Sequence, residues 1–445
     1  MQLSKNKKHQ YLFFFIFTIC LIFNGGNSNI LIQTNFILMS GLFIFCLKDK
    51  NYNLHFNNFY NRNKIPISFY LLFLTFLFFQ ILPLPIEFLK FFSPEKYKYI
   101  IDLKTDSTYS TITLSPSNSF FQILNFISLI ILVFILKMIF YTKRHKNRFY
   151  LFLSLLGFVT SLFAVIVYLN GNPDFFIFKN SYYKTAATGF FINRTAFAVF
   201  LLFSLIANLE LLKNIETQQF SKKKDNFFFK IYVRLFVIFI TIGIIASFSR
   251  IGNFLLLITI LFYFVNELFF SKNKSKSFRN IILLIIFFDI FIMGFYFGAN
   301  ELIDRFSLLK EEFSQITAIN SNLSRAQIFK FGLNQFYNFF LFGYGPGSFE
   351  TLFQINFKDL GSAYANHAHS DITEFFGEFG LIGMILLISS ILKLFYNKIF
   401  YNFNNYLLIV CLIVILMFDF SLHIPIIQFL FVIFLTFNQK FIKLS

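Results

Sequence analysis

The stretch Ser119–Phe140, SFFQILNFISLIILVFILKMIF, is continuous apolar sequence with a single charged residue, Lys137. An α-helix needs about 20 such residues to cross the roughly 30 Å hydrocarbon core of a bilayer. Similar runs recur along the 445-residue chain, of which 57% is apolar and 13% charged. The runs are continuous rather than alternating, which excludes spanning strands. The sequence therefore predicts an all-α polytopic membrane protein.

Twelve spans are predicted, all within one integral membrane domain that covers residues 1–445. Their approximate ranges are 11–23, 30–47, 65–82, 119–140, 150–169, 190–212, 231–248, 251–270, 281–298, 376–396, 406–422 and 424–437.

The formal net charge of +18 is spread unevenly between the loops. The loops on the side of the N-terminus hold about twice as many Lys and Arg residues as those on the other side. Short basic loops stay in the cytoplasm, so both termini are predicted to be cytoplasmic. The charge then reflects orientation and contact with anionic membrane lipids, and no nucleic-acid partner is expected.

One large outer loop is predicted at residues 299–375, between spans nine and ten. A loop of this length is typically functional or disordered. Within it, Ser321 and Asn322 precede an apolar stripe, which predicts an amphipathic helix on the membrane face. The following GYGPGSF, residues 343–349, predicts a turn because it is rich in Gly and Pro.

The histidines divide between the two sides. His9, His55 and His145 lie in basic loops and are expected to be solvated. His367, His369 and His423 fall on the outer side, where Asp371 and Glu374 match a capping box that starts span ten. The positive end of a helix lowers the pKa of a histidine beside it, so His369 is predicted to be neutral and suited to a general base. The alternative is a polar residue at a helix start.

A metal site is a second alternative for this segment, because His367, His369 and Asp371 would share one side of an extended strand. A helix starting at Asp371 breaks that geometry, and no further Cys or His cluster supports it. No metal and no cofactor is therefore expected.

Three arginines are predicted at the outer face: Arg194 at the start of span six, Arg250 between spans seven and eight, and Arg325 at the head of the loop helix. A guanidinium group is planar, permanently charged and able to bind phosphate through two hydrogen bonds. Together the three suit an anionic ligand. The alternative is that they extend to lipid headgroups, which fits Arg194 better than Arg250.

Five segments together resemble the O-antigen ligase and polymerase superfamily. They lie in family order over roughly residues 180–430. They are TGFFINRTAF (188–197), SFSRIGN (247–253), SRAQIFKFGLNQFYNFFLFGYGPGSF (324–349), HAHSDITEFFGEFGLIG (367–383) and FDFSLHIP (418–425).

The resemblance implies a GT-C-like membrane glycosyltransferase in the bacterial inner membrane, with its active site periplasmic. The implied reaction is metal-independent and inverting. The donor would be a glycan on undecaprenyl diphosphate, and the acceptor a glycan or lipid A-core, which makes the enzyme an O-antigen ligase or an O-antigen or exopolysaccharide polymerase. Chain-length regulator proteins are a further implied partner class.

The resemblance also assigns roles to residues. His369 matches the catalytic histidine, and Arg250 and Arg325 match the diphosphate-binding arginines. His367, Arg194 and Asp371 are expected to bind substrate.

The sequence departs from the family pattern at three positions. Ser370 replaces Asn, Phe329 replaces Trp, and Ala196 replaces a histidine, which removes any role for that histidine. Three other functions stay open on the sequence. A protein O-oligosaccharyltransferase shares the donor chemistry, a transporter would concentrate polar residues at the midplane, and a scaffold leaves the outer His and Arg unexplained.

Overall fold

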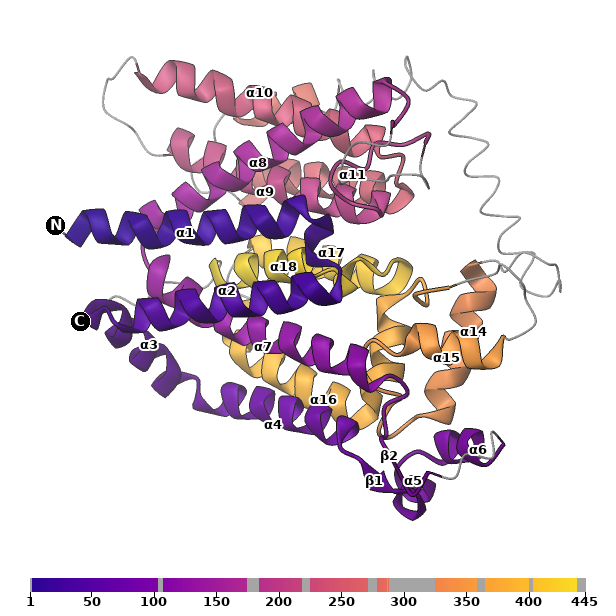
Figure 1. The fold of residues 1–445 in the computed structure, drawn as a ribbon. Helices are drawn as coiled ribbons and strands as arrows, with labels where there is room; N and C mark the ends of the chain where they lie inside the picture. Colours follow the sequence, from indigo (N-terminus) through magenta and orange to yellow (C-terminus); the bar gives the residue numbers. More distant parts are fainter. Residues whose placement is uncertain are drawn as a thin grey trace.

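The computed structural model describes residues 2–102, 107–173, 184–217, 225–270, 278–285, 287, 325–357, 365–399 and 403–437. In these ranges the chain is a bundle of long helices with short helices gathered at one end (Figure 1). This architecture confirms the predicted all-α polytopic class.

The first half of the chain contains both short strands, which pair antiparallel with Leu84 opposite Ser110. Its elements are α1 (Gln2–Ile22), η1 (Asn24–Gly26), α2 (Asn29–Leu47), α3 (Lys50–Arg62), α4 (Lys64–Ile81), β1 (Leu84–Pro85), α5 (Ile86–Phe92), α6 (Pro94–Asp102), β2 (Tyr109–Ser110), α7 (Pro116–Ile139), α8 (Lys143–Leu169) and α9 (Arg194–Thr217).

The second half is wholly helical in its described elements. These are α10 (Asp225–Ala246), α11 (Arg250–Val265), η2 (Asn266–Phe270), α14 (Arg325–Asn338), α15 (Phe349–Asn356), α16 (Asp371–Ile399), α17 (Phe403–Phe418), η4 (Ser421–His423) and α18 (Pro425–Phe437).

Eight described helices are long and apolar enough to cross a membrane. They are α2, α4, α7, α8, α9, α10, α11 with η2, and α16, while α17 and α18 are apolar but shorter. Every predicted span overlaps described helical residues. Of the ninth, 281–298, only 281–285 and 287 are described, and much of the predicted loop 299–375 also lies outside the described residues.

The two ends of the bundle differ. At the terminal end, α1 begins, α18 ends and the amphipathic α3 lies across the bundle (Figure 1). At the opposite end, α5, α6, the strand pair, α14 and α15 form a cap. We call this the capped end. The predicted loop helix is present as α14, which buries Ile328 and half-buries Phe331. That it lies on the membrane face stays a prediction.

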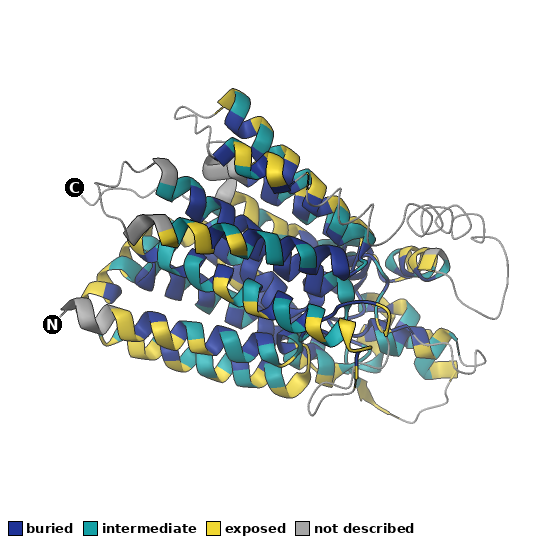
Figure 2. Ribbon diagram, turned by 90° about the horizontal axis from the view of Figure 1, so that it is seen from above, coloured by how far each residue is buried: buried dark blue, intermediate teal, exposed yellow. Residues whose placement is uncertain are grey.

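Helix α9 forms the centre of the bundle. It is almost entirely buried, and Figure 2 shows buried residues concentrated inside and exposed residues along the outer helices. Two glycines allow α8 and α10 to pack closely around it. A Cβ on Gly157 would lie 2.4 Å from the Ser204 Cβ, and one on Gly243 would lie 2.8 Å from a Leu201 methyl group. Close backbone approach through small residues is typical of helix pairs in membranes.

The expectation that His9 and His145 are solvated is wrong. Both are buried. The His9 ring stacks on Phe45 at 4.8 Å, and the His145 ring meets Tyr141 edge-on at 5.1 Å. Phe45 of α2 and Tyr141, between α7 and α8, cover these rings, which the lysines nearby in the sequence did not indicate.

Candidate functional site

The candidate site lies at the capped end, where the segment Ala365–Ser370 meets the start of α16 and the turn η4. Helix α16 begins at Asp371, as predicted. The expected capping box is wrong, however. The Asp371 carboxylate accepts a hydrogen bond from Leu422 N–H at 2.9 Å, and Glu374 bonds to a residue before the helix. Both carboxylates therefore bind tertiary partners.

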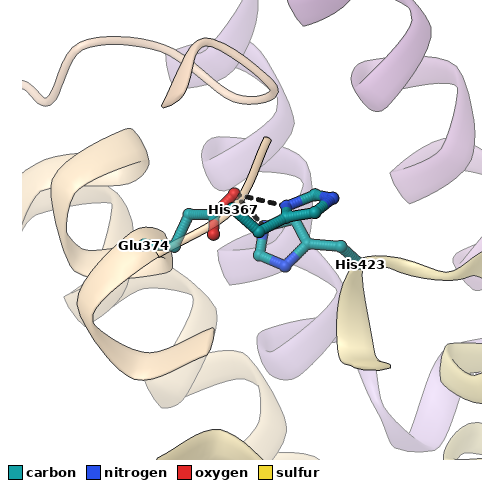
Figure 3. A group of neighbouring side chains, drawn as sticks. All are labelled: His367, Glu374 and His423. Carbon is teal, nitrogen blue, oxygen red and sulfur yellow. Dashed lines mark hydrogen bonds and ion pairs between the residues drawn. The ribbon is translucent and has the colours of Figure 1, made fainter. Parts of the chain in front are cut away.

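Glu374 holds the histidine segment in place. One of its oxygens, Oε1, lies 2.9 Å from His367 Nδ1, and the other accepts the Ala368 N–H at 2.8 Å. Figure 3 shows the Glu374 carboxylate facing the rings of both His367, which precedes α16, and His423, which belongs to η4. Because Glu374 is 1% exposed, these bonds are made away from water and are correspondingly strong.

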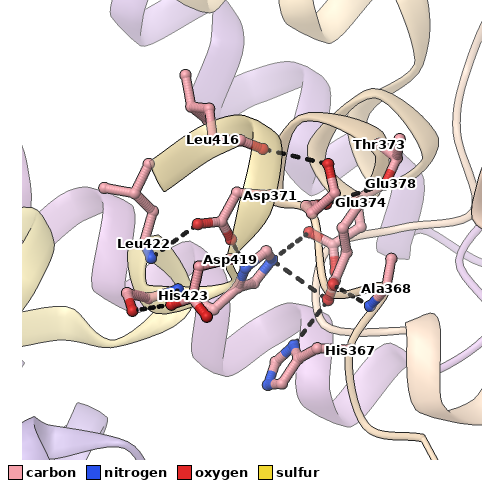
Figure 4. A network of polar contacts seen from close by, with 12 residues as sticks. His367, Ala368, Asp371, Thr373, Glu374, Glu378, Leu416, Asp419, Leu422 and His423 are labelled. Atoms are coloured by element: carbon pink, nitrogen blue, oxygen red, sulfur yellow. Dashed lines mark hydrogen bonds and ion pairs between the residues drawn. The ribbon is translucent and has the colours of Figure 1, made fainter. Parts of the chain in front are cut away.

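His423 is the centre of a buried polar network (Figure 4). Its Nδ1 pairs with Asp371 Oδ1, and its Nε2 lies 3.4 Å from Glu374 Oε1 and 3.6 Å from Glu378 Oε2. Phe375 stacks on the imidazole at 4.4 Å. Burial lowers the pKa of His423, but the facing carboxylates of Glu374 and Asp371 outweigh it and raise the pKa well above its usual value. The facing carboxylates therefore favour the imidazolium form of His423.

Glu378 connects this network to the glycine-rich turn between α14 and α15. Its Oε1 accepts the Gly347 N–H at 2.6 Å. Its backbone carbonyl accepts the Gly345 N–H at 3.1 Å. The predicted turn at residues 343–349 is confirmed, since Gly343, Gly345 and Gly347 all adopt positive φ. The turn thus fixes one wall of the site.

The network contains more carboxyl groups than cations. Four carboxylates are buried in or beside it, those of Asp371, Glu374, Glu378 and Asp419, and His423 supplies one positive charge among them. Buried charge is costly unless it is paired, protonated or bound to a metal. His367, Glu374 and His423 offer ligand atoms that all lie within 4.8 Å of one another, so this group also suits a small cation. It shares only His367 with the metal triad considered from sequence.

His369 lies at the edge of the network in an unusual backbone conformation. Its φ of 56° is in the left-handed region, which few residues other than Gly adopt and which is often associated with functional sites. Its ring meets Phe420 edge-on at 5.4 Å. Burial, with a further contribution from the Arg325 charge, lowers the pKa of His369 to about 4. A neutral imidazole at this position agrees with the sequence prediction, although burial rather than the helix terminus is the main cause.

Of the three arginines, Arg325 is the one whose charge acts on residues of this site. It starts α14 and is exposed. Its charge acts on His369 and also on Asp419, whose pKa burial raises to about 6 while the Ser421 hydrogen bond and Arg325 oppose the rise. Arg325 therefore places a positive charge beside His369 that remains open to a ligand.

Arg194 and Arg250 form a second group at the capped end. Arg194 is the first residue of α9 and Arg250 the first of α11, and both side chains are half-buried. The two helix starts are joined by a 3.2 Å hydrogen bond from Ser249 Oγ to Thr195 Oγ1. All six predicted site residues thus lie at one end of the bundle. That the two groups converge on a single ligand stays a prediction.

The sequence reasoning missed the most buried part of the site. It gave no role to His423, Glu378 or Asp419, and it treated Glu374 only as a helix cap. The available signal was the segment FDFSLHIP, which has three polar residues, Asp419, Ser421 and His423, in an apolar region and leads into a helix start at Pro425. Spacing within that segment does not reveal that it folds against α16.

A family model described as O-Antigen ligase matches residues 235–388. The matched region contains Arg250, Arg325, the glycine-rich turn and the histidine segment with the start of α16. Arg194 and His423 lie outside it. No curated protein matches the chain.

Proposed function

We propose that the chain, whose residues 235–388 match a family model described as O-Antigen ligase, transfers a glycan from undecaprenyl diphosphate to a sugar acceptor. The reaction takes place at the capped end, which faces the periplasm when both termini are cytoplasmic. The acceptor is a growing glycan or lipid A-core. The observation that carries the proposal is His369, half-buried in a left-handed backbone conformation at the edge of the network, with the charge of the exposed Arg325 acting on it.

In this mechanism, His369 is the general base. It accepts the proton of the acceptor hydroxyl as that oxygen attacks the anomeric carbon, and the bond from that carbon to the diphosphate oxygen breaks. One displacement inverts the configuration. A base with a pKa of about 4 is unprotonated at neutral pH and ready to accept a proton.

Arg250 and Arg325 have the complementary role of binding the diphosphate. Negative charge builds up on the leaving group as the anomeric bond breaks, and fixed guanidinium groups stabilise it without reorganisation. Arg194, His367 and Asp371 support substrate binding. For His367 and Asp371 the support is through the network, because Glu374 holds His367 and His423 holds Asp371.

The test is transfer by purified protein in detergent, with a polyprenyl-diphosphate glycan donor and an excess of chelator. We expect His369→Ala to lower kcat by about a hundredfold or more, the usual contribution of a general base, with little change in donor binding. Arg325→Ala should weaken both. His55→Ala, at the terminal end, is the control. Full activity of the His369→Ala variant would exclude His369 as the general base. If the chelator abolishes the activity of the wild-type protein, the reaction instead requires a cation bound by His367, Glu374 and His423.

A further inference from the structure

An apolar groove runs along α16 through the part of the bundle that lies between the two ends. Helices α4 and α7 form one wall, and α17 and α18 form the other; α4, α7 and α16 lie side by side in Figure 1. Its cavity volume is about 200 Å³. Lining residues on α16 extend from Phe375 to Leu394, which at roughly 1.5 Å per residue is about 28 Å. That length is close to the ~30 Å thickness of the bilayer's hydrocarbon core.

The groove presents almost no polar groups to an occupant. Where polar side chains line it, their hydrogen bonds are made within the protein. Tyr70 O–H donates to Phe126 O at 2.8 Å, Ser390 Oγ donates to Pro66 O at 2.9 Å, and the Gln428 amide donates to Leu422 O. Apolar cavities of about 150 Å³ stay dry and take up hydrocarbons. The chemistry of this groove therefore suits a hydrocarbon chain.

The groove is also open to such a chain from the side. Several of its aliphatic side chains, including Ile130, Leu387 and Leu412, are only half-buried, whereas the walls of a sealed cavity would be fully covered. A volume of about 200 Å³ along this groove leaves no room for a helix of a partner protein, which is about 10 Å across.

Two residues belong both to the groove and to the candidate site. Phe375 lines the groove and stacks on the His423 imidazole. Leu422 lines the groove, and its N–H donates to Asp371. A lipid whose chain lies in this groove has its headgroup at the capped end, beside the histidine segment.

We propose that this groove binds the polyprenyl chain of the lipid-linked donor. The proposal rests on the proposed function and adds a location for the lipid half of the substrate. The continuity with the network favours the reacting lipid over a bilayer phospholipid. The free energy gained when the polyprenyl chain binds then helps to position the diphosphate, which the protein itself binds through few charged groups.

The kinetic test compares two donors with the same glycan diphosphate, one carrying a full-length polyprenyl chain and one carrying two isoprene units. Leu387→Trp and Ile130→Trp fill the groove. We expect each to raise the KM of the long donor at least about tenfold, the equivalent of roughly two lost buried methylene groups, and to leave the short donor unchanged. Ile388→Trp is the matched control, on the same helix but exposed and outside the groove. An unchanged preference for the long donor in both groove variants overturns the proposal.

A binding measurement on the wild-type protein separates this proposal from the reaction. A polyprenyl phosphate with a photoreactive group in its chain is cross-linked to purified protein, and the labelled peptides are mapped. Labelling of α16 and α17 residues around Leu387 and Leu412 that survives excess phospholipid supports the groove, even if no glycan transfer is found. Labelling elsewhere, or labelling that phospholipid removes, overturns it whether or not the protein is active.

Discussion

His369 and His423 illustrate how neighbouring residues of one type acquire different chemistry. His369 is half-buried against Phe420 and under the influence of the Arg325 charge, which favours the neutral imidazole, whereas His423 faces carboxylates, which favour the imidazolium. Titratable groups whose environments drive their pKa values apart are typical of active sites. One histidine is thereby suited to accept a proton and the other to hold the structure.

The pH dependence of the reaction follows from the pKa of His369. A general base works only when unprotonated, so kcat/KM should fall on the acid side as pH drops through about 4, and stay level between about 5 and 7. The measurement is kcat/KM against pH in detergent, with enzyme stability checked at each pH. An acid limb near 6.5, the ordinary histidine value, would contradict the buried environment of His369.

His423 should be a positioning residue rather than a catalytic one. His423→Gln removes the cation from among buried carboxylates, and we expect unfolding stability to fall by about 3 kcal/mol or more. Because the folded pKa is raised above the unfolded one, this stabilisation is complete below about pH 6.5 and is lost as pH rises through the folded value. The difference between wild type and variant in thermal unfolding should therefore shrink in alkaline buffer.

A double-mutant cycle checks the assignment of His423. If its charge acts through Glu374, then Glu374→Gln combined with His423→Gln should cost clearly less than the sum of the two single changes. Additive costs would mean that the two side chains stabilise the site independently. Asn366→Gln, an exposed change in the same segment, serves as the control.

At the scale of elements, α16 is broken where it meets the glycine-rich turn. Gly380 has φ 62° and ψ −179°, which interrupts the helix. The backbone groups released there bond to the neighbouring segment, since Leu381 N–H donates to Phe340 O at 2.8 Å and Tyr344 N–H donates to Gly377 O at 2.9 Å. The break therefore fixes the turn on α16 and directs Glu378 into the network.

Gly343 tests this junction. Its φ is +75°, and a Cβ there would lie 2.2 Å from the backbone carbonyl oxygen of Glu378, which cannot move without disturbing α16. We expect Gly343→Ala to lower stability by about 2 kcal/mol or more and to reduce transfer activity. Gly41→Ala is the matched control, because Gly41 is an exposed helix residue with nothing within 4 Å of the added Cβ. It should be neutral or stabilising by up to about 1 kcal/mol. Equal effects of the two changes would argue against the junction.

At the scale of the whole molecule, the sequence predicted the elements better than their contacts. Apolar runs have the length of the bilayer, so the helices were predictable one at a time. The buried network was not, because it joins Glu374 and Glu378 on α16 to His423 after α17. Local patterns carry no information on that pairing. Asp371 and Glu374 are an example. Their spacing predicted a capping box, but both carboxylates instead accept hydrogen bonds from residues outside α16.

The predicted orientation of the molecule determines on which side of the membrane the proposed reaction takes place. Basic loops at the terminal end predict that this end faces the cytoplasm. Single cysteines test it, because Cys20, Cys46 and Cys411 are all buried and should react little with a membrane-impermeant maleimide. Asn366→Cys places an exposed thiol at the capped end, and Asn57→Cys places one on α3 at the terminal end.

In intact cells with a permeabilised outer membrane, we expect the reagent to label Asn366→Cys, and to label Asn57→Cys only after the inner membrane is opened. The reverse pattern would place His369 and the arginines in the cytoplasm. A glycan on undecaprenyl diphosphate that has crossed to the periplasm could not then reach them, so the reaction would have to use a donor on the cytoplasmic face. The labelling pattern thus decides on which side of the membrane the transfer takes place, independently of whether His369 is the base.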